Sequence, residues 1–227
     1  PDKYLNAEAR RRGWQFLNVF YCGGKVFPWL EAHGALVSGL PDSELVQDLR
    51  SKKGCKVVRL GHLPHPQDDQ VPAVLPDHAA FGRKAAEHFH DRKFQDVAYI
   101  GRDPWGNMRP MFDGFSQRAE ELGMGCHLLR YKSSKAFKNK TPPERYVERH
   151  AEFSEWLGKM PLPLGILASG DYAAAEICFM INQAGKDVPT DVAVLGRGNG
   201  MEICEGAMPP ISSFDNCRAA QVYAACE

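Results

Sequence analysis

The clearest pattern of hydrophobic and polar positions lies in residues 164–199. Two short apolar runs, residues 164–168 and 192–195, are each followed by polar and glycine residues, which is typical of strands buried on both faces. Between them, apolar side chains recur at helical spacing, at Ala174, Ile177, Cys178, Ile181 and Ala184. Gly185 and Pro189 end this helix. The stretch therefore predicts a strand, a helix and a second strand parallel to the first.

The same alternation runs through the rest of the chain. Further helices are predicted over residues 4–12, 43–50, 79–92, 111–122, 144–159 and from 218 onward, and further strands over residues 14–21, 34–38, 56–60, 94–100, 126–131 and 211–214. Strands that alternate with helices predict an α/β fold with parallel sheets. We interpret the pattern as two doubly wound lobes, the N-terminal one of residues 1–100 plus 213–227 and the C-terminal one of residues 101–212.

Polar residues follow both strands of the 164–199 stretch. Ser169, Gly170 and Asp171 follow the first strand, and residues 196–200 after the second read Gly-Arg-Gly-Asn-Gly. Ligands of open parallel sheets bind outside the carboxyl ends of the strands. We therefore expect the functional site at these two strand ends, with Asp171 as the N-cap of the helix that follows.

Composition narrows the classes of protein. The 227 residues include 28 basic and 28 acidic side chains, so the net charge is zero and does not indicate a basic nucleic-acid-binding face. No apolar run approaches the ~20 residues of a membrane-spanning helix, and the first residues do not form a signal peptide. Seven scattered cysteines without a short-spaced pair suit a reducing cytosol. We expect a cytoplasmic protein with no membrane partner.

The sequence lacks the common signatures of enzymes and cofactor sites. It has no Gly-x-Gly-x-x-Gly, no phosphate loop and no Gly-x-Ser-x-Gly nucleophile elbow. His88 and His90 are two residues apart, so on a helix they point to different sides, and no matching His or Cys pair accompanies them. We expect no enzyme activity, no metal and no cofactor. The rival interpretation is an α/β enzyme acting on a small polar substrate. It would need a set of residues that forms a nucleophile or a metal site, which the sequence does not show.

Four segments, in this order, resemble a known family. They are Pro76-Asp-His-Ala-Ala-Phe-Gly-Arg with Phe94-Gln-Asp-Val-Ala-Tyr-Ile-Gly; Phe112-Asp-Gly-Phe-Ser-Gln-Arg; residues 165–171; and Val188-Pro-Thr-Asp-Val-Ala-Val-Leu-Gly-Arg-Gly-Asn with Pro209-Pro-Ile-Ser-Ser-Phe. Over roughly residues 34–226 the chain is similar to effector-binding domains of the lac-repressor type. The resemblance implies a periplasmic-binding-protein-like fold of type I, with a ligand cleft between two lobes.

Two further motifs, Trp156-Leu-Gly-Lys-Met-Pro and Trp105-Gly-Asn-Met-Arg, look like the xylose-operon regulatory protein branch of that family. The resemblance implies a homodimeric transcription regulator that binds a pentose such as xylose and couples lobe closure to DNA binding. In that branch, DNA is bound by a helix-turn-helix region after the sensor domain, which nothing in this chain matches. The alternative is an extracytoplasmic sugar-binding protein of a transporter, which the scattered cysteines argue against.

Four residues are the first candidates for contacts with the sugar. Asp171 can accept hydrogen bonds from hydroxyl groups, Arg109 offers a planar fork of donors, and Asn199 offers both a donor and an acceptor. Trp105 offers an aromatic ring on which the sugar can stack. Each has a simpler interpretation: a helix cap for Asp171, a solvated loop for Arg109, a turn for Asn199 and surface packing for Trp105.

Two more candidates depend on the resemblance. Asp77 is a typical helix cap that faces the cleft in the family. Arg197 fills a position that is usually apolar there, and forms a salt bridge between lobes or reaches the ligand. Gly198 stands where the family usually has an aspartate that touches the sugar, so we expect weaker xylose binding or a preference for another pentose. The family's first strand and the end of its closing helix have no counterpart in the chain.

Overall fold

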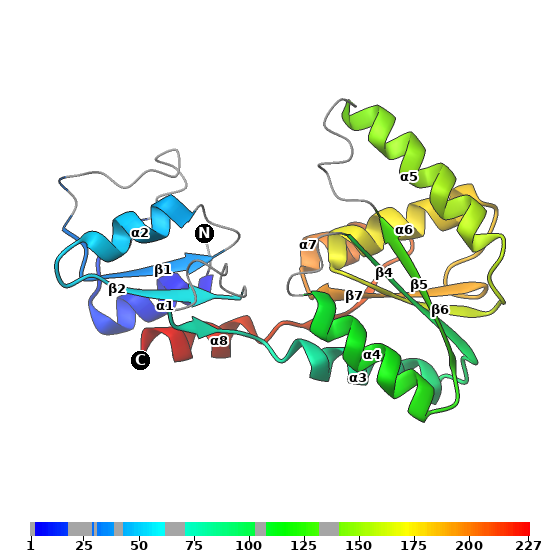
Figure 1. The fold of residues 1–227 in the computed structure, drawn as a ribbon, viewed down its shortest axis with the longest axis horizontal. Helices are drawn as coiled ribbons and strands as arrows, with labels where there is room; N and C mark the ends of the chain where they lie inside the picture. Colours follow the sequence, from blue (N-terminus) through cyan, green and yellow to red (C-terminus); the bar gives the residue numbers. More distant parts are fainter. Residues whose placement is uncertain are drawn as a thin grey trace. The chain divides into compact units, whose positions relative to one another are not determined.

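Helices and strands alternate along the chain in the computed structural model (Figure 1), as the pattern of apolar positions predicts. The structure describes residues 3–17, 29, 31–38, 43–61, 71–102, 108–131 and 141–227. The chain divides into two units, the first of Pro1–Pro76 and Cys217–Glu227 and the second of Asp77–Asn216. Each unit is built on its own parallel sheet, so the predicted α/β fold with two parallel-sheet lobes is confirmed.

The first unit has a sheet of three strands in the order β1–β2–β3. Its elements are α1 (Lys3–Arg12), β1 (Gly34–Ser38), α2 (Ser43–Ser51), β2 (Lys56–Leu60), β3 (Ala73–Val74) and α8 (Arg218–Cys226). Val46 and Leu49 of α2 pack on one face of the sheet, against Val37 and Val57. α1 and α8 pack on the residues that point the other way, among them Leu60. Both faces of the small sheet are therefore covered, as parallel sheets require.

The second unit has a sheet of five parallel strands in the order β5–β4–β6–β7–β8. Its elements are α3 (His78–Asp91), β4 (Asp96–Arg102), α4 (Met108–Glu121), β5 (Gly125–Tyr131), α5 (Pro142–Leu157), β6 (Leu164–Ala168), α6 (Asp171–Gln183), β7 (Val192–Gly198), α7 (Met201–Gly206) and β8 (Ser212–Asp215). Within this unit α3 and α4 lie on one face of the sheet, and α5 and α6 on the other (Figure 1). All five residues of β6 are buried, as its apolar run predicts.

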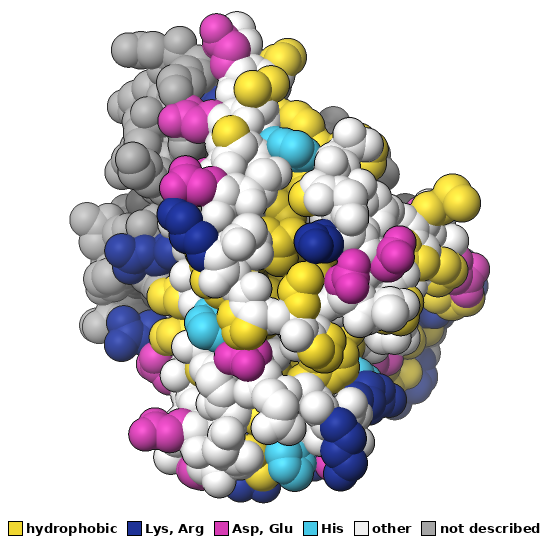
Figure 2. Space-filling model, turned by 90° about the vertical axis from the view of Figure 1, so that its right-hand side faces the viewer, with side chains coloured by type: hydrophobic (Ala, Val, Ile, Leu, Met, Phe, Trp, Pro, Cys, Tyr) yellow, Lys and Arg dark blue, Asp and Glu magenta, His cyan; other side chains and the backbone are white. Residues whose placement is uncertain are grey.

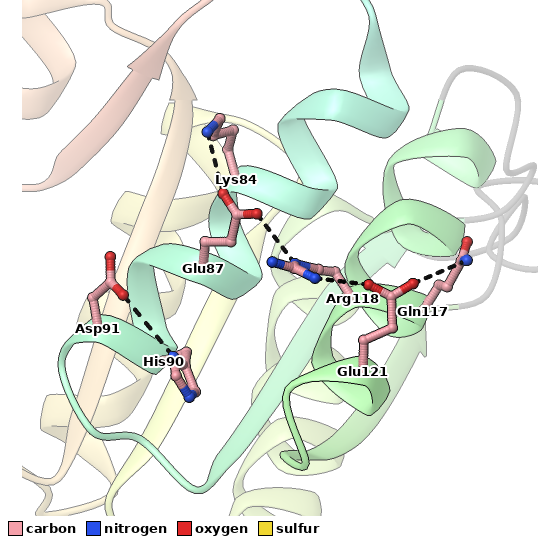
Figure 3. A network of polar contacts seen from close by, with 7 residues as sticks. All are labelled: Lys84, Glu87, His90, Asp91, Gln117, Arg118 and Glu121. Carbon is pink, nitrogen blue, oxygen red and sulfur yellow. Dashed lines mark hydrogen bonds and ion pairs between the residues drawn. The ribbon is translucent and has the colours of Figure 1, made fainter.

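α3 and α4 cross at very short distance because glycines meet at the crossing. A Cβ atom on Gly82 would lie 2.1 Å from the carbonyl oxygen of Met111, and one on Gly114 would lie 2.3 Å from that of Ala79. Beside the crossing, Arg118 of α4 donates to Glu87 of α3 at 3.1 Å, within the network of polar contacts in Figure 3. The two helices thus form one rigid layer of the second unit.

The boundary between the units differs from the predicted one. β4 pairs with β5 on one side and with β6 on the other, so it is an inner strand of the second sheet. The chain therefore passes between the units next to residues 76 and 216, not near residues 100 and 212. The apolar run of β4 indicates burial on both faces but carries no information about which sheet the strand joins, and that is why the prediction was wrong.

The strand predicted over residues 14–21 is not formed in its described part, residues 14–17. The chain turns at Gly13, where φ is +67°, and the Trp14 N–H donates to the carbonyl oxygen of Ala9 at 2.8 Å. Trp14 then lies under the Arg12 guanidinium, 5.1 Å from ring centroid to cation. The remainder of the predicted strand lies outside the described residues. The short helix α7 was not predicted, since six residues are too few to show a helical period.

The basic residues at the end of α1 are not simply solvated. Arg11 and Arg12 both pair with the carboxylate of Glu8, whose side chain is 1 % exposed. Hydrogen bonds from Arg11 and then from Arg12 lower the pKa of Glu8 to about 2. These ion pairs lie within α1 and stabilise its last turns. Among the helices that the structure describes, none is long and apolar enough to cross a membrane.

Candidate functional site

An open hollow of about 590 Å³ lies at the carboxyl ends of β6 and β7, within the second unit. It is lined by Ser169, Gly170, Asp171, Tyr172, Ala173, Glu176, Arg197, Gly198, Gly200 and Ile203. These residues come from the end of β6, the start of α6, the end of β7 and the start of α7. β6 and β7 are parallel neighbours, so their polar ends meet at the same edge of the sheet. The hollow thus occupies the position that the strand ends predict.

Asp171 does not cap α6, contrary to the prediction. It is the first helical residue, the N-cap is Gly170, and no side chain caps the helix. The carboxylate instead accepts hydrogen bonds from the backbone N–H of Gly200 at 2.9 Å and from the hydroxyl of Ser213 at 2.5 Å. Asp171 is only 6 % exposed. It therefore links the start of α6 to the turn after β7 and to β8.

Glycines of the β7 end form a floor under this carboxylate. A Cβ atom on Gly196 would lie 2.5 Å from Oδ1 of Asp171, and one on Gly198 would lie 2.7 Å from Oδ2. Gly198 also has φ +134°, a conformation that side chains disfavour. Ser213 stands opposite Gly196 in the strand register, which places its hydroxyl beside the carboxylate. Only glycines at positions 196 and 198 leave room for Asp171.

Arg197 lies between the two glycines and projects across the strand ends. It donates to the carbonyl oxygen of Ser169 at 3.3 Å and to Oδ1 of Asn216 at 3.2 Å. Burial lowers the pKa of Arg197, and its interaction with Asp171 opposes that shift. Burial also raises the pKa of the neighbouring Tyr99 hydroxyl. The guanidinium is therefore a partly desolvated cation held at the wall of the hollow by neutral oxygen atoms.

The other predicted site residues have different surroundings. Asn199 has φ +52° and an exposed side chain, and its N–H donates to the hydroxyl of Ser213 at 3.0 Å, which fits a turn residue beside the hollow. Asp77 is the N-cap of α3 and accepts from the N–H of Ala80 at 2.8 Å. Arg109 lies in α4, not in a loop, and forms an exposed ion pair with Asp113 at 2.8 Å. Trp105 lies outside the described residues.

The hollow also contains residues that the sequence did not single out. Ser213 and Asn216 hold Asp171 and Arg197, respectively, although they follow them by 42 and 19 positions. Glu176 lines the hollow and pairs with Arg149 of α5 at 2.8 Å, while Tyr172 stands at its mouth with 80 % of its surface exposed. Tyr172 could have been identified from its position next to Asp171. No local pattern in the sequence indicates Ser213 and Asn216, which reach the site from a distant part of the chain.

The described residues contain no group of three or more His, Cys, Asp and Glu side chains placed to hold a metal ion. Cys55, Cys126, Cys178, Cys204, Cys217 and Cys226 are free thiols. On the face of the molecule in Figure 2, acidic, basic and hydrophobic side chains are interspersed, in keeping with the zero net charge. The side chains that line the hollow, among them Asp171, Glu176 and Arg197, offer hydrogen bonding and charge pairing.

Solved structures with the same fold are numerous. A probable maltose operon transcriptional repressor from Staphylococcus has 14 % identity and a TM-score of 0.65 over 86 % of this chain and 66 % of that one. A CelR–cellobiose complex has 17 % identity and a TM-score of 0.72 over 98 % and 68 %. A LacI-type regulator from Alkaliphilus metalliredigens, complexed with D-xylulofuranose, has 14 % identity and a TM-score of 0.66 over 98 % and 80 %.

This chain thus spans just under two thirds of the probable maltose repressor. A comparison with curated proteins gives no match. Residues 86–227, more than half of the chain, match the periplasmic binding protein-like domain family. That match contains β4 to α8 and every residue of the hollow. The chain therefore belongs to the periplasmic binding protein-like domain family and has the fold of a lac-repressor-type effector-binding domain.

Proposed function

We propose that this chain is the sugar-sensing effector-binding domain of a bacterial transcription regulator, and that a pentose such as xylose binds in the hollow of the second unit. The observation that carries the proposal is the seating of Asp171. Its carboxylate is held over a glycine floor beside Arg197, at the carboxyl ends of β6 and β7. This is the edge of the sheet at which α/β proteins bind small polar ligands.

The groups around the hollow match the hydrogen-bonding needs of a sugar. A carboxylate has about four acceptor positions, and Asp171 uses two of them for Gly200 and Ser213. Sugar hydroxyls can donate to the others. Arg197 supplies donors from a planar fork, and Tyr172 supplies an exposed ring at the mouth for the apolar face of the sugar.

The remaining candidates are part of the proposal as well. Asn199 follows Gly198 at the same strand end, with its side chain free to turn toward a ligand. Arg109 lies at the start of α4, which follows β4, a strand that ends at the same edge of the sheet as β6. Trp105, outside the described residues, is proposed as a stacking platform for the sugar. Asp77 is proposed chiefly as the cap of α3, and as a ligand contact only through the family resemblance.

The fold comparisons support the ligand class. Structures with this fold hold cellobiose and D-xylulofuranose, and other structures with this fold are described as transcription regulators. For the whole protein we propose a cytoplasmic homodimer in which sugar binding alters affinity for DNA. A ligand can shift such an equilibrium only by binding one form more tightly than the other. We propose no catalytic activity for this domain.

Calorimetric titration of the chain with a panel of pentoses and hexoses tests the proposal. We expect a pentose or pentose derivative to bind, and Asp171→Ala to weaken that binding ~10–150-fold, since a hydrogen bond to a charged group contributes ~1.5–3 kcal/mol. Asp91→Ala is the matched control, because Asp91 lies at the far end of α3 and 77 % of its side chain is exposed. A folded sample that bound no sugar would overturn the proposal, as would an Asp171→Ala variant with parental affinity.

A further inference from the structure

The acidic groups of the hollow already have partners. Asp171 is 6 % exposed and receives hydrogen bonds from Gly200 and Ser213. Glu176 is paired with Arg149 at 2.8 Å, and the two side chains are 25 % and 19 % exposed. The charge of Glu176 is thus compensated by Arg149, and two acceptor positions of Asp171 are occupied by neutral donors.

Arg197, unlike Glu176, has no ion-pair partner among the described residues. Both hydrogen-bonding partners of Arg197, the carbonyl oxygen of Ser169 and the side-chain oxygen of Asn216, are neutral. Their distances of 3.2–3.4 Å are long for a guanidinium, whose bonds to carboxylates usually measure about 2.7–2.9 Å. Asp171 is near enough to influence Arg197 through charge, but no hydrogen bond or ion pair joins the two within the described residues. The fork of Arg197 thus retains capacity for an anion.

The start of α6 adds donors on the same hollow. Gly170 provides no side-chain cap, and within the described part of the chain the N–H groups of Asp171, Tyr172 and Ala173 have no acceptor. These residues line the hollow together with Arg197. Unpaired N–H groups at a helix start favour anions, although the charge of Asp171 itself offsets part of this effect.

We propose that the natural ligand of this hollow is a sugar derivative with an anionic group, a carboxylate or a phosphate, bound by the guanidinium of Arg197. The inference rests on the proposed sugar-binding function and specifies its ligand class. The anionic group lies against Arg197 and the start of α6, and the hydroxyl groups of the same ligand donate to Asp171. The glycine floor favours this arrangement, since no side chain at positions 196, 198 or 200 separates Arg197 from the hollow.

The experiment compares four ligands by calorimetric titration of the 227-residue chain: a pentose, the matching pentonate, a pentose 5-phosphate and inorganic phosphate. We expect the pentonate or the pentose phosphate to bind at least ~10-fold more tightly than the neutral pentose, as a charge-assisted pair with arginine provides. The two anionic sugars separate a carboxylate source from a phosphate source. Raising the salt concentration about tenfold should weaken the binding of the anionic sugar more than that of the pentose.

Arg197→Gln should remove the preference for the anionic sugar, so that the pentose and both anionic sugars bind with similar affinity. Arg197→Lys keeps the charge but loses the fork, so we expect an intermediate preference and use this variant if Arg197→Gln does not fold. Arg118→Gln is the control, because Arg118 lies in the α3–α4 network shown in Figure 3 and not in the hollow. It should retain the parental preference.

Four results would overturn the proposal. If the pentose binds as tightly as both anionic sugars, or if Arg197→Gln keeps the preference, the ligand class is wrong while the proposed sugar-sensing function stands. If inorganic phosphate binds as tightly as the pentose phosphate, the hollow holds an ion without recognising a sugar. If no sugar of any class binds to folded protein, the proposed function fails together with the inference.

Discussion

Asp77 and Asp171 stand at the starts of two helices in the same unit and have opposite surroundings. Asp77 is exposed and makes the local contact of a helix cap, to a backbone N–H three residues further on. Asp171 is buried and makes no local contact; its partners, Gly200 and Ser213, are 29 and 42 residues away. Two residues of the same type at similar places in the sequence thus contribute to stability in different ways, one through its own helix and one through the tertiary structure.

The difference follows from what lies opposite each carboxylate. Near Asp171, glycines of β7 leave a space that the carboxylate fills, and two partly buried donors, on Gly200 and Ser213, face it. Asp77 precedes a helix whose close contact, with α4, is made further along by Gly82 and not by the cap. A cap satisfies N–H groups that water can also reach, whereas the donors near Asp171 are partly buried, so the loss of their acceptor costs more free energy.

The largest effect is expected for Asp171→Ala, which should lower the free energy of unfolding of the second unit by ~3 kcal/mol. The variant removes two hydrogen bonds to a buried charged group and leaves the N–H of Gly200 without its acceptor. Denaturant unfolding followed by circular dichroism measures the change. A loss of ~1 kcal/mol or less, the usual effect of a lost cap, would show that Asp171 acts like Asp77.

Gly198→Ala should destabilise the protein by ~1–3 kcal/mol. The added Cβ would lie 2.7 Å from Oδ2 of Asp171, at a backbone φ of +134° that alanine disfavours. Gly206→Ala is the matched control, since a Cβ there meets nothing within 4 Å. Thermal unfolding of the two variants in parallel gives the comparison. Equal melting temperatures would contradict the description of the glycine floor.

Asp77→Ala should cost ~1 kcal/mol, the usual effect of a lost N-cap, and Asp77→Asn should cost very little, because asparagine caps helices about as well as aspartate. Asp171→Asn, in contrast, should remain clearly destabilising, because its NH₂ group replaces one of the two oxygens that accept from Gly200 and Ser213 and cannot accept a hydrogen bond. The two asparagine variants, compared by urea unfolding, separate a cap from a buried bridge. Equal losses in both would remove that distinction.

Glu8 provides a third acid, in the first unit, whose partners are charged. Its pKa is about 2 in the folded state, lowered by Arg11 and Arg12, against an ordinary value of 4.5. Its contribution is therefore fully present above pH 4.5 and is lost as the pH falls toward 2. We expect the parent to lose more stability over this window than Glu8→Gln does. The difference should be small, because the Arg11 side chain is largely exposed and salt screens its charge. Unfolding curves of both proteins at several acidic pH values test this prediction. If the free energy of unfolding fell equally with pH in both, the ion pairs of Glu8 would not contribute to stability.

Much of the local structure follows from the sequence for physical reasons. Residues 164–198 show the predicted strand, helix and strand, because the spacing of apolar side chains directly expresses which faces of an element are buried. The cap at Asp77 was predictable, since its acceptor and donor are three residues apart. The polar strand ends also indicated the position of the hollow, because parallel strands bring their carboxyl ends to one edge.

Only the tertiary structure decided the rest. Periodicity along β4 indicates burial but not its neighbours, so the division of the chain between two sheets depended on pairing with β5 and β6. The partners of Asp171 come from β8 and from the turn after β7, and nothing within a few residues of position 171 signals them. Local propensity acts over one or two turns of a helix, whereas a buried carboxylate is satisfied by whatever donors the fold places beside it, and for Asp171 these arise from strand order and register.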